Sequence, residues 1–167
     1  MSTLPLPQTR GCLVCGRANP HGLHLILHVD PATSQVTTTF TPRPEHIGFE
    51  NIIHGGLLAT VLDEAMVWSS IWSAKRACVA AELTIRYRAS ALPGDVLHVT
   101  ATLDTTRSKL ITTTGQIRRP SDNATIATAT GKFIPLDESR HQAFLTTFID
   151  DPTTREAATL LRGKPAP

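Results

Sequence analysis

Residues 55–73 constrain the fold of this chain more than any other segment. Their apolar side chains surround a helical wheel instead of lining one stripe of it: Leu57, Leu58, Val61, Leu62, Ala65, Met66, Trp68, Ile71 and Trp72. Asp63 and Glu64, near the middle, are the only charged residues of the segment. A helix that is apolar on most sides has to be buried on most sides. The sequence therefore predicts one long helix enclosed by the rest of the chain.

Strand candidates lie on both sides of this segment. Their side chains alternate between apolar and polar or are rich in β-branched types. They span residues 23–28, 36–40, 83–88, 96–103, 110–117 and 125–133. Turn signals such as Pro93-Gly94 separate the later runs, and short connections favour antiparallel strands. We expect an α+β fold, an antiparallel sheet wrapped round one central helix. Small residues such as Gly131 would let the sheet approach that helix closely.

The chain has 167 residues, enough for one domain with its own hydrophobic core. Residues 1–23 contain several turn signals and are expected to form a loop-rich arm. The domain itself is expected at residues 24–136. Residues 137–167 would form a C-terminal extension, with a short surface helix at 138–149 and then a frayed tail.

Charge and hydropathy exclude some classes of function. A formal net charge of +2 is too small to indicate a nucleic-acid-binding protein. No run of about 18 apolar residues is present, so no membrane span is expected. Residues 1–8 lack the basic start of a signal peptide, and three cysteines do not suggest a disulfide framework. We expect a cytoplasmic protein.

The arm carries one pattern with metal-binding spacing. Cys12 and Cys15 are separated by two residues and are followed by His21 and His24, which admits a zinc site. The gap between Cys15 and His21 is short for a zinc finger. We therefore expect a turn-forming arm with no metal and no cofactor, and we expect Cys78 to be a buried strand residue.

Three stretches carry a resemblance to a known family. They are His54-Gly55-Gly56 followed by Asp63-Glu64, the opening Cys12–Gly16 with Asn19-Pro20 and Gly22-Leu23, and the strand Glu82–Arg88. Together they resemble the hotdog-fold acyl-CoA thioesterases, in the group related to the phenylacetate-pathway thioesterases (PaaI-like). The resemblance runs from about residue 11 to residue 135.

This resemblance implies hydrolysis of acyl-CoA thioesters without metal or organic cofactor. It also implies a homodimer whose sheets are joined, or a dimer of dimers, with active sites at the subunit interface. The acid at Asp63 would be the catalytic carboxylate. The glycine at Gly55 would offer its backbone N–H to the thioester carbonyl.

The residues themselves support a division of the site between two subunits. Gly55 and Gly56 begin a helix, where backbone N–H groups lack partners and can hold an oxyanion. Asp63, eight residues on, lies about 12 Å further along the helix axis. One chain cannot bring both groups to one substrate, whereas a two-fold dimer with antiparallel helices can. Asp63 would either activate water or attack the carbonyl, and His54 would orient the substrate or fix the loop.

Further residues are candidates for contacts with substrate. These are Asn51, Gly56, Glu64, Arg86, Arg88 and Lys109, the basic ones for the phosphates of CoA. Trp68 and Trp72 are better explained as core or interface residues than as an acyl pocket. Two positions depart from the family: Gly48 stands where relatives often have Asn or Gln, and Ala80 where they often have Ser or Thr. Both favour a rival hypothesis, a non-catalytic hotdog module that binds acyl-CoA or another apolar ligand.

Overall fold

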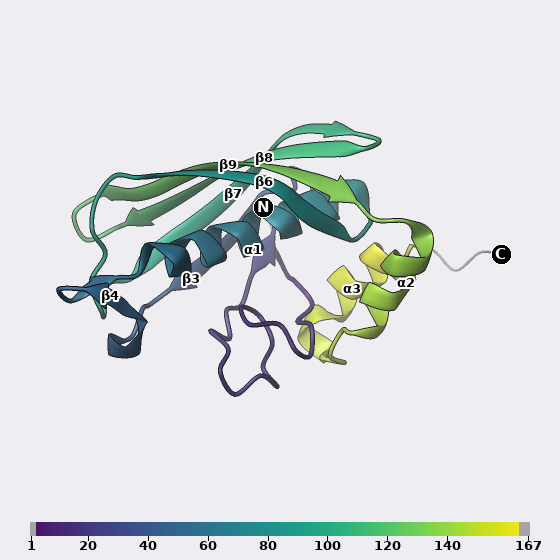
Figure 1. Cartoon of the computed structure of the whole chain (residues 1–167). Coiled ribbons are helices and arrows are strands. Elements are labelled where there is room, and N and C mark those ends of the chain that lie inside the picture. Colours follow the sequence, from purple (N-terminus) through teal and green to yellow (C-terminus); the bar gives the residue numbers. More distant parts are fainter. Residues whose placement is uncertain (1–2, 164–167) are drawn as a thin grey trace.

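The computed structural model describes residues 3–163 as an antiparallel sheet wrapped along one long helix, α1 (Gly55–Ala74) (Figure 1). The sheet has seven strands in the order β1-β2-β3-β7-β8-β9-β6. Their bounds are β1 Leu4–Pro5, β2 His28–Val29, β3 Val36–Phe40, β6 Cys78–Tyr87, β7 Leu97–Arg107, β8 Leu110–Arg119 and β9 Ala124–Pro135. The expected α+β fold, a sheet around one buried helix, is confirmed. Among the described residues no helix is long and apolar enough to span a membrane.

The sheet packs closely on α1 because two of its strands carry glycine opposite Met66. A Cβ on Gly115 of β8 would lie 2.7 Å from Met66 Sδ, and one on Gly131 of β9 would lie 2.8 Å from Met66 Cε. The flexible thioether therefore fills the space that these two glycines leave. Met66 itself is fully buried, as are most apolar residues of the helix.

β6 is an edge strand. It pairs with β9, at residues from Cys78↔Pro135 to Tyr87↔Ala127, and no other strand of residues 3–163 pairs with its second edge. The next strand along the chain, β7, pairs with β3 and β8 instead. Large apolar side chains on β6 are exposed, with Val79 at 47% and Tyr87 at 52%. An unpaired edge of ten residues with exposed apolar side chains is a site where a further strand can pair.

The N-terminal part of the sheet is more irregular than the alternating pattern predicted. The expected strand at 23–28 is wrong, because β2 covers His28–Val29 alone. His24 adopts a left-handed conformation with φ 55°, which interrupts a regular ladder. Leu23 and Leu25 donate instead to Leu13 and Val14 of the arm. A small hairpin of β4 (Ile47–Phe49) and β5 (Ile52–Ile53), preceded by a 3-10 turn at Pro44–His46, was not expected.

The C-terminal extension contains two helices, α2 (Glu138–Thr146) and α3 (Arg155–Arg162), with a 3-10 turn at Pro152–Thr154 between them. α2 lies within the expected helix, whereas α3 was not expected. The arm and the extension are joined by backbone hydrogen bonds, from Arg10 to Thr147 and from Ile149 to Gln8, each 2.9 Å long. Most of the predicted frayed tail, residues 164–167, lies outside the described residues.

The arm and the extension together cover the C-terminal half of α1. There the ring of Trp68 packs on Phe144 and Phe148, at centroid distances of 5.9 and 6.2 Å. The N-terminal half is less covered: Gly56 is exposed, and Gly55 and Asp63 are half-buried. The uncovered end of α1 therefore lies between the 47–53 hairpin and the free edge of the sheet.

Candidate active site

The start of α1 leaves one backbone donor free. His54 caps the helix, and its Nδ1 accepts a 2.9 Å hydrogen bond from the N–H of Gly56. The N–H groups of Leu57 and Leu58 donate to the carbonyl oxygen of His54. The N–H of Gly55 has no acceptor among the described residues. Of the four N–H groups that a helix start exposes, the one that remains available is therefore that of Gly55.

Tyr87 contacts Gly55 directly, although it was not among the expected site residues. Its hydroxyl group donates a 2.8 Å hydrogen bond to the carbonyl oxygen of Gly55. A Cβ on Gly55 would lie 3.2 Å from Cζ of the Tyr87 ring. A side chain on residue 55 would therefore press on the Tyr87 ring, which would have to move by a few tenths of an ångström.

Gly48 has a comparable reason to be glycine. A Cβ at this position would lie 3.1 Å from the Cα and Cδ2 atoms of His54. The space that a longer side chain would need is occupied by the capping histidine. Where relatives often have Asn or Gln, this chain has Gly48, and the 47–53 hairpin lies in close contact with the helix start at this residue.

A cavity of about 360 Å³ opens beside the free donor. Most of its lining residues are apolar, and Tyr87, Arg88 and Ser90 are the ones with polar side chains. Its lining residues are Ile52, Ile53, Gly55, Leu58, Tyr87, Arg88, Ala89, Ser90 and Ala91. A largely apolar cavity with a few convergent polar groups is typical of a small-molecule site.

Asp63 lies on the same helix, two turns beyond Gly55. Its carboxyl group is half-buried, and burial raises its pKa above the usual value for an aspartate. Oδ1 is buried and accepts no hydrogen bond from any described residue. A buried carboxylate oxygen without a donor is costly, so a partner for Oδ1 has to come from outside the described residues.

The expected substrate contacts are not gathered in one place within the chain. Arg88 lines the cavity with Gly55. Asn51 is exposed at the turn between β4 and β5, with φ 63°. Lys109 lies in the β7–β8 turn, beside the C-terminal end of α1, where Thr106 Oγ1 is 2.5 Å from Ser73 Oγ. Within one chain it is therefore at the opposite end of the helix from Gly55.

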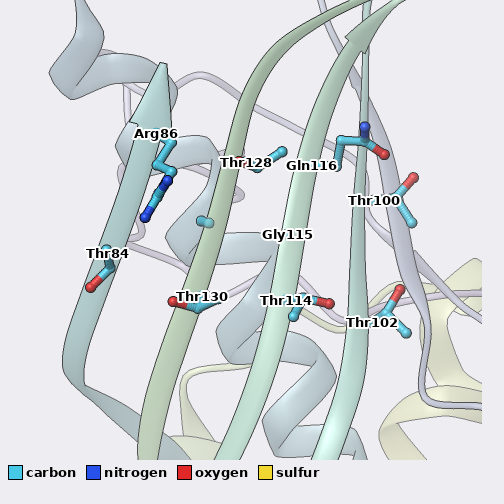
Figure 2. Close-up of a pocket in the computed structure, with 10 residues that line it drawn as sticks. Thr84, Arg86, Thr100, Thr102, Thr114, Gly115, Gln116, Thr128 and Thr130 are labelled. Atoms are coloured by element: carbon cyan, nitrogen blue, oxygen red, sulfur yellow. The ribbon is translucent and has the colours of Figure 1, made fainter. Parts of the chain in front are cut away.

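Arg86 projects onto the other face of the sheet. Figure 2 shows its guanidinium among threonines of β6, β7, β8 and β9, in a depression of about 470 Å³. Gly115 lines the same depression but borders Met66 on its inner side. Arg86 belongs to β6 and Arg88 follows the end of that strand at Tyr87, and the two residues line different hollows.

Glu64 faces the arm and not the cavity that Gly55 lines. It accepts hydrogen bonds from Cys12 Sγ at 3.6 Å and from Trp68 Nε1 at 3.0 Å. Burial raises the pKa of Glu64 to about 7. Hydrogen bonds from the Cys15 thiol and from the N–H groups of Cys15 and Val14 lower the pKa of Cys12 to about 5. The same contact with Cys12 raises the pKa of Cys15.

The two histidines that follow the Cys-x2-Cys pair in the sequence do not join these cysteines. His24 Nε2 lies 2.6 Å from the carbonyl oxygen of Asn19, and His21 is exposed. Trp68 and Trp72 are buried core residues, as expected. Cys78 is buried at the start of β6, also as expected.

Residues 50–126 match the family model described as the thioesterase superfamily. A solved thioesterase superfamily protein is similar over 75% of this chain and 60% of its own, with 26% identity and a TM-score of 0.68. The PaaI protein of the phenylacetic acid degradation operon of E. coli is 22% identical, with a TM-score of 0.59 over 63% of this chain and 75% of its own.

An acyl-CoA hydrolase from Staphylococcus aureus, solved in complex with butyryl-CoA and CoA, is 19% identical, with a TM-score of 0.60. The similarity covers 65% of this chain and 66% of that one. No curated protein matches the sequence.

Proposed function

We propose that this chain, of which residues 50–126 match the thioesterase superfamily model, hydrolyses acyl-CoA thioesters to the free acid and CoA. The observation that carries this proposal is the unpartnered N–H of Gly55 beside a largely apolar cavity. A backbone donor at a helix start stabilises the oxyanion that forms when a thioester carbonyl is attacked. The S. aureus relative that was solved with butyryl-CoA supports an acyl-CoA as ligand.

The second catalytic group, Asp63, would come from another subunit. Two β6 edges that pair antiparallel about a two-fold axis would continue the sheet across the dimer. The two α1 helices would then run antiparallel side by side, because each lies under its own sheet. Asp63 of one subunit would lie beside Gly55 of the other, and the less covered half of α1 would become buried. The free edge of β6 and the unpartnered Oδ1 of Asp63 both support this arrangement.

Hydrolysis at such a site follows one of two routes. In the first, the Asp63 carboxylate takes a proton from water, whose oxygen attacks the thioester carbon. The oxyanion on the N–H of Gly55 collapses, the C–S bond breaks, and the CoA thiolate takes up a proton. In the second, the Asp63 carboxylate attacks the thioester carbon and the C–S bond breaks, which releases the CoA thiolate. Water then cleaves the mixed anhydride to the free acid and the Asp63 carboxylate. Arg88, at the same cavity, is suited to a phosphate of CoA.

The test measures thiol release from acetyl-, butyryl-, palmitoyl- and phenylacetyl-CoA. Wild-type protein is expected to hydrolyse at least one of them, and Asp63→Asn to lose roughly 10²- to 10⁴-fold in kcat. Asp104→Asn makes the same chemical change at an exposed position of β7 and serves as the control. Single turnover in H₂¹⁸O tests the anhydride route. Water that attacks the Asp63 carboxyl carbon of the anhydride leaves ¹⁸O in Asp63 and an unlabelled oxygen in the product acid, whereas direct attack by water on the thioester leaves Asp63 unlabelled.

One observation favours an alternative function, in which the protein binds acyl-CoA or another apolar ligand without hydrolysing it. Gly48 has no polar side chain that could position water, and a Cβ added there would lie 3.1 Å from His54. Tight binding of CoA esters by wild-type protein, with no thiol release from any of the four, would support this alternative and contradict the enzyme proposal.

A further inference from the structure

Cys12, Cys15 and Glu64 bring three potential metal ligands together at the junction of the arm and α1. One ligand atom from each residue lies within 4.8 Å of the others. Glu64 is 52 residues from Cys12 in the sequence, yet its two oxygens lie 3.6 and 3.7 Å from Cys12 Sγ. The fold therefore assembles a cluster that neither segment contains alone.

The spacing of the cluster fits tetrahedral coordination. With Zn–S bonds of about 2.3 Å and Zn–O bonds of about 2.0 Å, a tetrahedral zinc holds sulfur and oxygen ligands about 3.5 Å apart. The Cys12–Glu64 distance of 3.6 Å is close to this value. Cys15 Sγ lies within 4.8 Å of both ligand atoms, so a small adjustment brings all three ligands to one cation.

The turn that carries the two cysteines is built to hold a sulfur anion. The N–H groups of Val14 and Cys15 point at Cys12 Sγ, at 3.2 and 3.4 Å. Such converging backbone donors favour negative charge. The turn closes at Gly16, where a Cβ would lie 2.5 Å from the carbonyl oxygen of Cys12. The Cys-x2-Cys spacing is also the one that structural zinc sites use.

Glu64 is fixed in place but lacks a compensating cation. The indole N–H of Trp68 donates to its Oε1 at 3.0 Å, which orients the carboxylate as outer partners of metal ligands do. Within residues 3–163 it forms no ion pair with lysine, arginine or histidine. A mostly buried carboxylate beside two sulfur atoms is unfavourable without a positive charge. A divalent cation would supply that charge.

We propose that Cys12, Cys15 and Glu64 bind one Zn²⁺ ion, with water as the fourth ligand. Cys12 is only half-buried, which leaves room for that water on the solvent side. Sulfur ligands select zinc over magnesium and calcium, which prefer oxygen. The ion ties the arm to α1 at the residue next to Asp63. Its role is structural and does not depend on the proposed thioesterase activity.

The first measurement is the metal content of the full chain, purified under reducing conditions with added zinc. About one zinc per chain is expected by mass spectrometry of the elements. The protein is then stripped with a chelator and titrated with Co²⁺. A sulfur-to-cobalt charge-transfer band in the near ultraviolet, with visible bands of tetrahedral cobalt, is expected at one equivalent.

Variants identify the ligands. Cys12→Ser, Cys15→Ser and Glu64→Gln should each weaken zinc binding by about 100-fold or more, and Trp68→Phe by about 10-fold. Cys78→Ser removes the third cysteine, which lies outside the cluster, and should leave binding unchanged. A chelator should lower the melting temperature of wild-type protein and of Cys78→Ser, but not that of Cys12→Ser.

Three results would overturn the proposal. They are zinc and cobalt binding no tighter than to Cys12→Ser, a cobalt spectrum without sulfur ligation, or metal-free native protein whose mass is two hydrogens lower because Cys12 and Cys15 form a disulfide. If a ligand variant does not fold, the wild-type cobalt titration still decides. None of these measurements uses hydrolysis, so they are independent of the test of Asp63.

Discussion

The hydroxyl group of Tyr87 donates a 2.8 Å hydrogen bond to the carbonyl oxygen of Gly55, and Cζ of its ring lies 3.2 Å from the place that a Cβ on residue 55 would take. This contact joins the last residue of β6 to the first residue of α1. The free edge of the sheet and the free N–H of the helix start are therefore held together. A change in the position of β6 at the proposed dimer interface would therefore also change the position of Gly55 at the proposed oxyanion site.

Gly55→Pro tests the N–H of residue 55 directly. Proline is tolerated at the first position of a helix, and His54, at ψ 125°, already has the conformation that precedes proline. Gly55→Ala adds the same Cβ and keeps the N–H, so it is the matched control. We expect kcat of the proline variant to fall about 100-fold below that of the alanine variant, as when an oxyanion donor is removed. Equal rates in the two variants would show that the N–H of Gly55 has no catalytic part.

His54→Asn separates capping from chemistry. Asparagine is a good N-cap and can accept from the N–H of Gly56, whereas His54→Ala leaves that donor without its acceptor. In urea unfolding, the alanine variant should lose about 1 kcal/mol and the asparagine variant should stay within about 0.5 kcal/mol of wild type. The asparagine variant should also keep its kcat. If it is stable but more than 10-fold slower, the imidazole ring acts on the substrate.

Mixed dimers test whether each active site is shared between subunits. Gly55→Pro and Asp63→Asn homodimers should both be inactive, because each lacks one group in both sites. In a randomly mixed population, half of the dimers are mixed and each has one intact site, so activity should recover to about one quarter of wild type. Co-expression with two affinity tags isolates the mixed species for assay. Recovery to no more than the mean of the two parents would place both groups in one subunit.

Gly115→Ala tests the close approach of the sheet to α1. The added methyl group would lie 2.7 Å from Met66 Sδ and 3.0 Å from Leu62 Cδ2. Overpacking of this kind costs about 1–3 kcal/mol in the free energy of unfolding, because the core has to shift. Gly11→Ala, at a position with no atom within 4 Å of the added carbon, is the control and should change stability by less than about 0.5 kcal/mol. Equal stability of both variants would mean that Met66 moves aside freely.

Asp122→Asn tests the charge cluster at the β8–β9 turn. Arg119 forms ion pairs with Asp95 at 2.8 Å and with Asp122 at 2.7 Å, and the hydrogen bond from Arg119 lowers the pKa of Asp122 to about 2. A carboxyl group whose pKa is lower in the folded state stabilises the protein above its usual pKa of 3.8. That contribution is lost as the pH falls from 3.8 towards 2.

Melting temperatures measured from pH 6 to pH 2 test whether the stabilising contribution of Asp122 decreases as the pH falls. The wild type should be more stable than Asp122→Asn at pH 6, and the difference should shrink as the pH approaches 2. Because the side chains are partly exposed, added salt should reduce the difference as well. A difference that is independent of pH would exclude the ion pair as its cause.

Local periodicity was enough to predict the parts of the fold that depend on neighbours in the chain. The all-round apolar pattern of residues 55–73 gave a helix that the structure places at Gly55–Ala74. The alternation in residues 110–117 and 125–133 gave β8 and β9. The strand expected at 23–28 failed because a left-handed residue, His24, interrupts it. The helix Arg155–Arg162 was missed because its apolar face is only Ala157, Ala158 and Leu161.

For the candidate site, the sequence by itself determined where a free N–H begins a helix and how far along that helix Asp63 lies, since both follow from helix geometry. Tertiary structure alone decided that Tyr87 closes on Gly55, that Arg86 and Arg88 line different hollows, and that Glu64 meets Cys12 from 52 residues away. These contacts depend on strand order and on the path of the arm across α1. Spacing along the chain does not encode either one, because each is set by how whole elements pack.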